Sequence, residues 1–193
     1  MVSFHIAYTS PINPAGSSPL LTRAQVWAGL QRKIRHADEF VPAIVACHVL
    51  SETGPCPNPE VTREVEFKPG MGPPGRVREV CRSFHPSWVD FVQRDGSTVK
   101  NVLSDGAPSE EGGESTLWMT YVFEWRHDGV AEGGEQAKVL EEKHRKVGDT
   151  NYPAPMGESG PELGDAWPLR VAKMAVDSSI ESIRNMVREG KIE

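Results

Sequence analysis

The sequence predicts an α+β domain in which one curved antiparallel sheet packs against a single long amphipathic helix. Three observations carry this prediction. Near the N-terminus, a segment in which apolar and polar residues alternate is followed by a segment with helical periodicity. Six further strand-like segments are separated by turn-like spacers, and a segment near the C-terminus carries the apolar stripe of an amphipathic helix. Consecutive strands joined by short turns typically form an antiparallel meander. Because 193 residues suffice for one substantial core, we expect residues 1–193 to form a single domain.

The first strand and the first helix have clear sequence signals. Residues 3–10 alternate apolar and polar side chains, which is the period of a half-buried strand. Thr22 then begins a helix, because Gln25 three positions later completes a capping-box pattern. A short turn at residues 38–41 ends before Pro42, since proline disfavours helical geometry in the residue before it. The apolar face of the helix comprises Val26, Trp27, Leu30 and Ile34.

The six strand-like runs account for the middle of the chain. They span residues 44–52, 61–68, 76–84, 87–94, 97–104 and 116–126. The last is the clearest, because apolar side chains from Leu117 to Trp125 occupy every second position. The run at 87–94 is compatible with two inward-facing sets: Trp88, Asp90 and Val92, or Val89 and Phe91.

The C-terminal third combines two helices with a long irregular segment. Residues 136–146 form a short, mostly polar helical stretch, and residues 148–167, rich in Gly and Pro, indicate a loop insertion. The final helix begins near Pro168, a favourable first helical residue, and ends at Gly190. Arg184 falls off its apolar stripe, which comprises Ala172, Val176, Ser179, Ile180, Ile183 and Val187.

Composition argues against several classes of partner and cofactor. The net charge of −6 makes nucleic acid an unlikely partner, and no apolar run has the length of a membrane span. Three cysteines without a C-x-x-C pair, and scattered histidines, predict neither a disulfide scaffold nor a metal site. A G-x-G-x-x-G pattern at residues 70–75 precedes a strand rather than a helix, so we expect no dinucleotide and no other cofactor. The N-terminus lacks a secretory signal pattern, which favours a cytoplasmic protein.

Strand alternation selects the side chains that face the helix. The polar ones are His48, Arg63, Glu79, Asn101 and Tyr121. In an apolar cavity Glu79 would act as acid or base, Tyr121 would donate to an enolate oxygen, Arg63 would hold a carboxylate or carbonyl, and His48 would shuttle protons. Asn101 would contact a ligand, together with an apolar wall of Met119, Phe123, Trp125, Val99, Phe67 and Ile183.

Simpler interpretations of the same residues stay open. Arg63 and Glu79 lie on strands expected to be neighbours, so they would pair across the ladder and leave Glu79 inert. His48 would be a satisfied core or rim histidine, and Tyr121 and Trp125 would be core filler. Trp118 faces outward by the same alternation, which leaves a homodimer as one expectation.

Several sequence blocks, in this order, resemble the AtaL-like family. This uncharacterised branch of the START and birch-pollen-allergen (SRPBCC) superfamily is named after a fungal biosynthetic-cluster protein. The resemblance covers most of residues 3–127 and 169–190, and it departs from the family at 148–167. The blocks are LTRAQVWAGL at 21–30, FVPAI at 40–44, CHVL at 47–50, REVEF at 63–67, VREV at 77–80, DGS at 95–97, LWMTYVFEW at 117–125 and AVDSSIESIR at 175–184.

The resemblance implies a helix-grip fold, a curved seven-stranded antiparallel sheet wrapped around the C-terminal helix, with a hydrophobic cavity. Taken with the inward polar set, it leads us to expect a protein that binds a hydrophobic, partly oxygenated small molecule. The expected chemistry is cofactor-free cyclisation, dehydration or isomerisation of a polyketide-like intermediate of secondary metabolism. The alternative is a carrier or sensor that binds a lipid or polyketide-like ligand without turnover.

Overall fold

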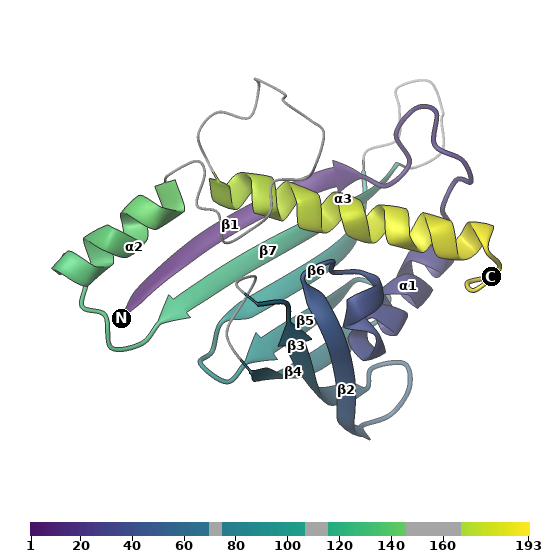
Figure 1. Cartoon of the computed structure of the whole chain (residues 1–193). Coiled ribbons are helices and arrows are strands. Elements are labelled where there is room, and N and C mark those ends of the chain that lie inside the picture. Colours follow the sequence, from purple (N-terminus) through teal and green to yellow (C-terminus); the bar gives the residue numbers. More distant parts are fainter. Residues whose placement is uncertain (70–74, 107–115, 146–166) are drawn as a thin grey trace.

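The computed structural model describes residues 1–69, 75–106, 116–145 and 167–193. The predicted insertion at 148–167 therefore lies almost entirely outside the described residues. In chain order the elements are β1 (Val2–Pro11), α1 (Arg23–Arg35), a short 3-10 turn η1 (Ala37–Glu39), β2 (Ile44–Thr53), β3 (Glu60–Phe67), β4 (Arg76–Phe84), β5 (Trp88–Gln93), β6 (Thr98–Asp105), β7 (Leu117–His127), α2 (Glu135–Arg145) and α3 (Trp167–Arg188) (Figure 1).

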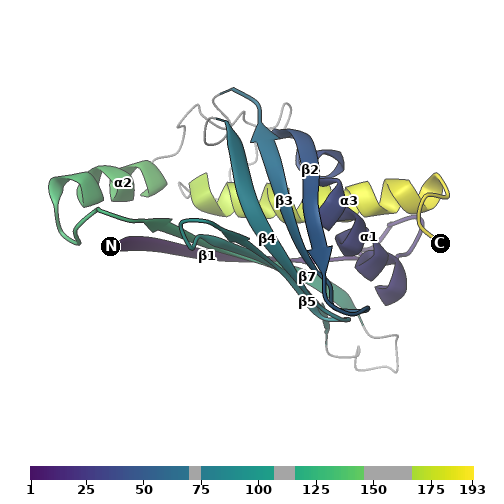
Figure 2. The same cartoon turned by 90° about the horizontal axis from the view of Figure 1, so that it is seen from below.

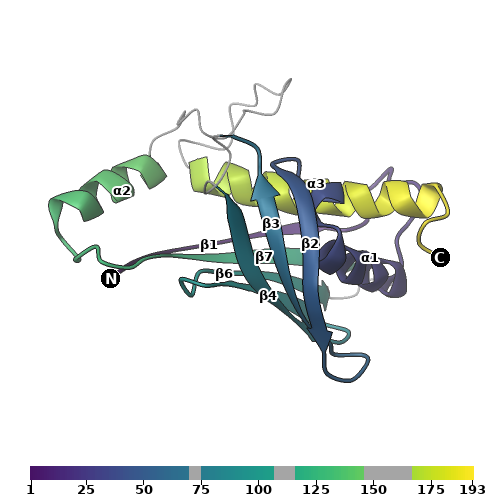
Figure 3. The same ribbon diagram turned by 60° about the horizontal axis from the view of Figure 1, so that its bottom comes forward.

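The seven strands form one antiparallel sheet in the order β1-β7-β6-β5-β4-β3-β2. β2 to β7 follow one another as a meander, and β1 pairs with β7 over its whole length, from Val2 opposite His127 to Pro11 opposite Trp118. The sheet curves around α3: β1 and β7 run beneath it, while β2, β3 and β4 turn up beside α1 (Figures 2 and 3). The predicted fold class is confirmed.

The capping box that the sequence predicts at the start of α1 is present. The Gln25 backbone N–H donates to Thr22 Oγ1 at 3.2 Å, and the Thr22 N–H donates to Gln25 Oε1 at 3.0 Å. The predicted apolar face of α1 is buried, but Gly29 and Lys33 are buried with it. α1 therefore enters the interior with a cation near its C-terminal end.

α3 buries the predicted stripe except Val187, which is half-buried, and it also buries Arg184, which the helical pattern had placed off the stripe. The Arg184 guanidinium donates to the carbonyl oxygens of Ile12 at 2.5 Å and Pro19 at 3.3 Å, and it pairs with Glu181 at 2.8 Å. A long arginine can cover apolar surface while its charged head finds acceptors in a loop. That loop, which follows β1, lies far away in sequence, so helical periodicity alone could not show it.

Gly29 lets α1 pack closely against Ile183 of α3. A Cβ placed on Gly29 would lie 2.4 Å from Ile183 Cγ1 and 2.7 Å from Ile183 Cδ1. Ile183 is fully buried, so it has little room to move. The absence of a side chain at Gly29 thus sets the spacing of the two helices.

We expect Gly29→Ala to lower the free energy of unfolding by up to about 2 kcal/mol. Overpacking costs about 1–3 kcal/mol, and the roughly 1 kcal/mol that alanine gains over glycine in a helix offsets part of this cost. Urea denaturation measures the effect. The double variant with Ile183→Ala should be less destabilised than the sum of the two single variants, and strict additivity would contradict the contact.

Candidate functional site

A buried lysine joins α1 to the sheet and to α3. Lys33 Nζ donates to Tyr121 OH at 2.8 Å, to Asn101 Oδ1 at 3.1 Å and to Ser179 Oγ at 3.2 Å. These partners come from β7, β6 and α3, and all four side chains are buried. We call Lys33, Asn101, Tyr121 and Ser179 the Lys33 cluster.

The burial of the cluster changes its proton chemistry. Desolvation lowers the pKa of Lys33 from 10.5 to about 7, and the nearby Arg63 charge acts in the same direction, while Glu79 opposes it. Desolvation also raises the pKa of the Tyr121 phenol, although a hydrogen bond with Ser179 acts against this. Near neutral pH the amine therefore exists in both protonation states beside a phenol that keeps its proton.

The sequence interpretation missed Lys33. Its position three residues after Leu30 and one before Ile34 places it on the apolar face of α1. A charged residue inside an apolar helical stripe was the signal available. Strand alternation, which predicts the other inward polar residues, says nothing about a helix.

Arg63 and Glu79 form an ion pair inside the protein. The Arg63 Nη2 and Nε atoms lie 2.6 and 2.9 Å from Glu79 Oε2, and the two residues face each other across β3 and β4. Arg63 Nη1 also donates to the backbone carbonyls of Lys33 and Ile34 at 2.7 and 2.9 Å, where it closes the end of α1. The cross-strand pairing that the sequence left open is confirmed, so Glu79 is not a free carboxylate facing a cavity.

His48 lies on the opposite face of the sheet from the one predicted. A register shift between Ile44 and Ala46 turns β2, so that Cys47 pairs with the buried Val65 and His48 pairs with Glu64. His48 is exposed, and so is Leu50. A β-bulge inverts the alternation beyond it, and for this reason the inward orientation predicted for His48 is wrong.

The other predicted wall residues divide into two groups. Met119, Phe123, Ile183 and Asn101 are buried in the main interior, where Val99 and Trp125 are half-buried against the main core cluster. Phe67 instead packs on a small separate cluster around Val65. On β5 the inward set is Val89 and Phe91.

An incompletely covered apolar surface continues from the Lys33 cluster along the sheet. On β7 the Tyr121 and Phe123 rings meet edge to face with centroids 6.2 Å apart, and the Phe123 and Trp125 rings are 5.3 Å apart. Ile6 and Tyr8 on β1 pair with Phe123 and Tyr121 in register. We call the half-buried Ile6, Tyr8, Val99 and Trp125 the apolar face.

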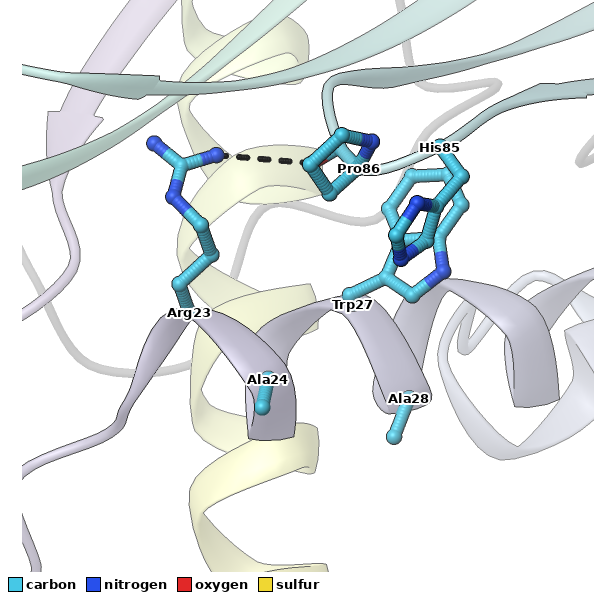
Figure 4. Close-up of a pocket in the computed structure, with 6 residues that line it drawn as sticks. All are labelled: Arg23, Ala24, Trp27, Ala28, His85 and Pro86. Atoms are coloured by element: carbon cyan, nitrogen blue, oxygen red, sulfur yellow. Dashed lines mark hydrogen bonds between the residues drawn. The ribbon is translucent and has the colours of Figure 1, made fainter. Parts of the chain in front are cut away.

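A pocket of about 400 Å³ lies elsewhere, between the start of α1 and the turn that joins β4 to β5 (Figure 4). The Trp27 and His85 rings meet edge-on there with centroids 5.3 Å apart, and Arg23 Nη1 donates to the Pro86 carbonyl at 3.4 Å. Strand alternation selected none of its lining residues, which are Arg23, Ala24, Trp27, Ala28, His85 and Pro86. The Lys33 cluster, in contrast, brings four buried polar side chains together, and with the apolar face it forms the candidate site.

Neither a metal centre nor a membrane helix is evident in the described ranges. No three His, Cys, Asp or Glu side chains gather there in the way that a metal ion requires. Among the described helices, none combines the length and the apolar character needed to cross a bilayer.

The seven-stranded antiparallel sheet wrapped around a C-terminal helix defines a helix-grip fold. The chain is similar over 97% of its length to the di-domain ARO/CYC StfQ from the steffimycin biosynthetic pathway, with a TM-score of 0.52 and 13% identity. It spans about half of that chain, 52%. It is also similar to the protein of unknown function SA2116 from Staphylococcus aureus, with a TM-score of 0.51 and 7% identity over 97% of this chain and 98% of that one. At such low identities these similarities establish the fold.

Sequence similarity identifies the family. Residues 6–153 match the family model AtaL, described as acetylaranotin biosynthesis cluster protein L, and the chain belongs to this family. The relative of that name from Aspergillus terreus (strain NIH 2624 / FGSC A1156) is 28% identical over 145 residues, which cover 75% of this chain and 80% of the relative.

Proposed function

We propose that this chain binds an apolar, oxygenated intermediate of secondary metabolism between the sheet and α3, and catalyses a cofactor-free acid–base reaction on it. Membership of a family described by a biosynthesis-cluster protein supports the metabolic setting. The reaction would be a cyclisation, a dehydration or an isomerisation, because each of these needs only proton transfers and a site that holds an oxygen atom.

The observation that carries the proposal is the position of the Lys33 amine. It lies at the buried end of the aromatic row Tyr121–Phe123–Trp125, whose other end is half-buried on the apolar face. A ligand seated on Trp125 and Val99 would direct its polar end toward Lys33 and Tyr121. Apolar walls with a few convergent polar groups are typical of small-molecule sites.

The cluster supplies both halves of a proton transfer. With a pKa of about 7, the Lys33 amine is partly neutral at physiological pH and can remove a proton next to a ligand carbonyl. The Tyr121 phenol, which burial keeps protonated, can donate a hydrogen bond to the resulting enolate oxygen. Lys33 then returns the proton at another carbon or to a leaving hydroxyl.

The alternative is a carrier that binds the same ligand without turnover. The observation that favours it is the ion pair between Arg63 and Glu79. Arg63 binds the carboxylate that the sequence interpretation assigned as acid or base. In addition, the oxygens of Asn101, Tyr121 and Ser179 accept hydrogen bonds from the Lys33 amine. Such a satisfied amine would suit a structural role.

Exchange of ketone protons for deuterium distinguishes the two functions. With 2-tetralone, an apolar ketone, as the probe, we expect the wild-type protein to accelerate exchange at the carbon between the ring and the carbonyl, as followed by proton NMR in D2O. Lys33→Met should abolish the acceleration and change the Kd by less than about threefold. A protein that binds 2-tetralone without accelerating exchange would be a carrier.

Two tryptophans of β7 test where the ligand binds. Trp125→Ala should weaken 2-tetralone binding by about tenfold, or about 1.4 kcal/mol, because the ring forms part of the apolar face. Trp118→Ala, which replaces an outward-facing tryptophan near the other end of β7, is the matched control and should leave binding unchanged. Equal losses in both variants, measured by calorimetry, would contradict the proposed location.

A further inference from the structure

We infer that the Lys33 amine is a nucleophile that condenses with the carbonyl carbon of an apolar ketone or aldehyde. The inference rests on the proposed function, since it assumes that the ligand occupies the same interior. It goes further because it assigns a covalent step to a residue and names carbonyl compounds as the substrate class.

The surroundings of the amine favour a nucleophile over a structural cation. In the described part of the chain no carboxylate lies within ion-pair distance of Lys33 Nζ, and its partners are a phenol, an amide oxygen and a hydroxyl. The Tyr121 and Phe91 ring centroids lie 4.4 and 5.7 Å from Nζ; these contacts stabilise the protonated amine, and the desolvation of the buried amine opposes them. Lysines become nucleophilic when an apolar pocket desolvates them, because the neutral amine is then populated near neutral pH.

Asn101 gives an independent indication that an oxygen-bearing ligand belongs here. In the structure the Asn101 amide turns its oxygen toward Lys33, as it must while the amine is protonated and has only donors. This leaves the Asn101 Nδ2 group fully buried without an acceptor among the described residues. A buried donor without a partner costs about 1–3 kcal/mol. A ligand carbonyl oxygen would satisfy Nδ2 beside the amine.

The step balances without an oxidant or a reductant. The lone pair of the neutral amine forms a C–N bond to the carbonyl carbon, and the C=O π pair moves to the oxygen, which accepts a hydrogen bond from Asn101 Nδ2. Tyr121 relays one proton from the nitrogen to this oxygen, which gives a neutral carbinolamine. The C–O bond then breaks, and the oxygen leaves as water with the second nitrogen proton, so that an imine remains.

Reductive trapping tests this step on the intact protein. The protein is treated with 2-tetralone and cyanoborohydride near pH 7, and intact-mass and peptide-mapping spectra are recorded. We expect one adduct per chain, with a mass gain of the ketone less its oxygen, located on Lys33. Peptide mapping of the wild-type protein locates the adduct without any variant, so the test does not depend on the folding of Lys33→Met.

Three variants sharpen the result. Lys33→Met should remain unlabelled. Lys100→Met should label like the wild type, because Lys100 lies on the surface and pairs with Asp90 at 3.4 Å. Tyr121→Phe should slow labelling by about tenfold, since it removes the proton relay. Labelling spread over surface lysines, at equal rates in the wild type and in Lys33→Met, would overturn the inference.

Parallel binding and exchange measurements separate the inference from the proposed function. Binding and accelerated exchange without an adduct would overturn the nucleophile and leave acid–base catalysis by the same amine. Failure to bind 2-tetralone, with labelling no faster than on surface lysines, would count against both.

Discussion

The wild-type protein should gain stability relative to its Lys33→Met variant as the pH rises from about 7 to 10.5. Lys33 in the unfolded chain keeps its proton up to a pKa of 10.5, whereas in the folded protein its pKa is about 7. Between these values the unfolded state binds a proton that the folded state has released, so the free energy of unfolding rises with pH. Over the whole interval the gain amounts to roughly 5 kcal/mol. Below the folded pKa the difference between the two proteins should be constant.

Urea denaturation of both proteins across this pH interval measures the effect. Subtracting the free energy of unfolding of Lys33→Met from that of the wild type at each pH removes the contributions of the titrating groups that the two proteins share. Lys100→Met is the matched control for the loss of a lysine, because the Lys100 side chain is 43% exposed and pairs with Asp90 at 3.4 Å. A pH-independent difference between wild type and Lys33→Met would show that the amine is not desolvated in the folded state.

Glu79→Gln should destabilise the protein by about 3–5 kcal/mol, because it leaves the buried Arg63 guanidinium without a counter-charge. The urea midpoint reports this loss. Glu64→Gln on the outer face of β3 is the matched control, since Glu64 pairs with the exposed Arg78 at 2.9 Å. That surface pair should contribute less than about 1 kcal/mol.

The Glu79→Gln experiment also tests whether Glu79 or Lys33 is the acid–base group. Replacing both partners, as in Arg63→Met with Glu79→Leu, should recover part of the loss, although the carbonyls of Lys33 and Ile34 would lose their donor. If Glu79→Gln left stability unchanged and abolished ketone exchange, then Glu79 rather than Lys33 would be the acid–base group.

The fold was predictable because its signals are local. The alternation from Leu117 to Trp125 and the capping box at Thr22 each depend on a few neighbouring residues, and both features appear in the structure. Given the order of the elements, the long C-terminal helix is the element able to cover the apolar side of the sheet. The bulge in β2 was not predictable in this way, because nothing in the sequence around Ile44 and Ala46 marks the extra residue.

The site was only partly predictable because it depends on contacts between distant elements. Strand alternation correctly placed Asn101, Tyr121, Arg63 and Glu79 on the inner face. It could not show that Arg63 and Glu79 form an ion pair, because an inward-facing carboxylate gives the same strand alternation whether it is free or paired. Lys33 was missed because its partners lie on β6, β7 and α3, at sequence separations of 68, 88 and 146 residues.

NMR of the lysine side chains, labelled with 13C at Cε, tests the central claim most directly. The Lys33 signal, identified by its loss in Lys33→Met, should titrate with a midpoint near 7 and shift when 2-tetralone is added. The Lys100 signal serves as an internal reference and should not respond to the ketone. A Lys33 signal that titrated near 10.5 and did not respond to 2-tetralone would contradict a reactive amine in a ligand-binding interior.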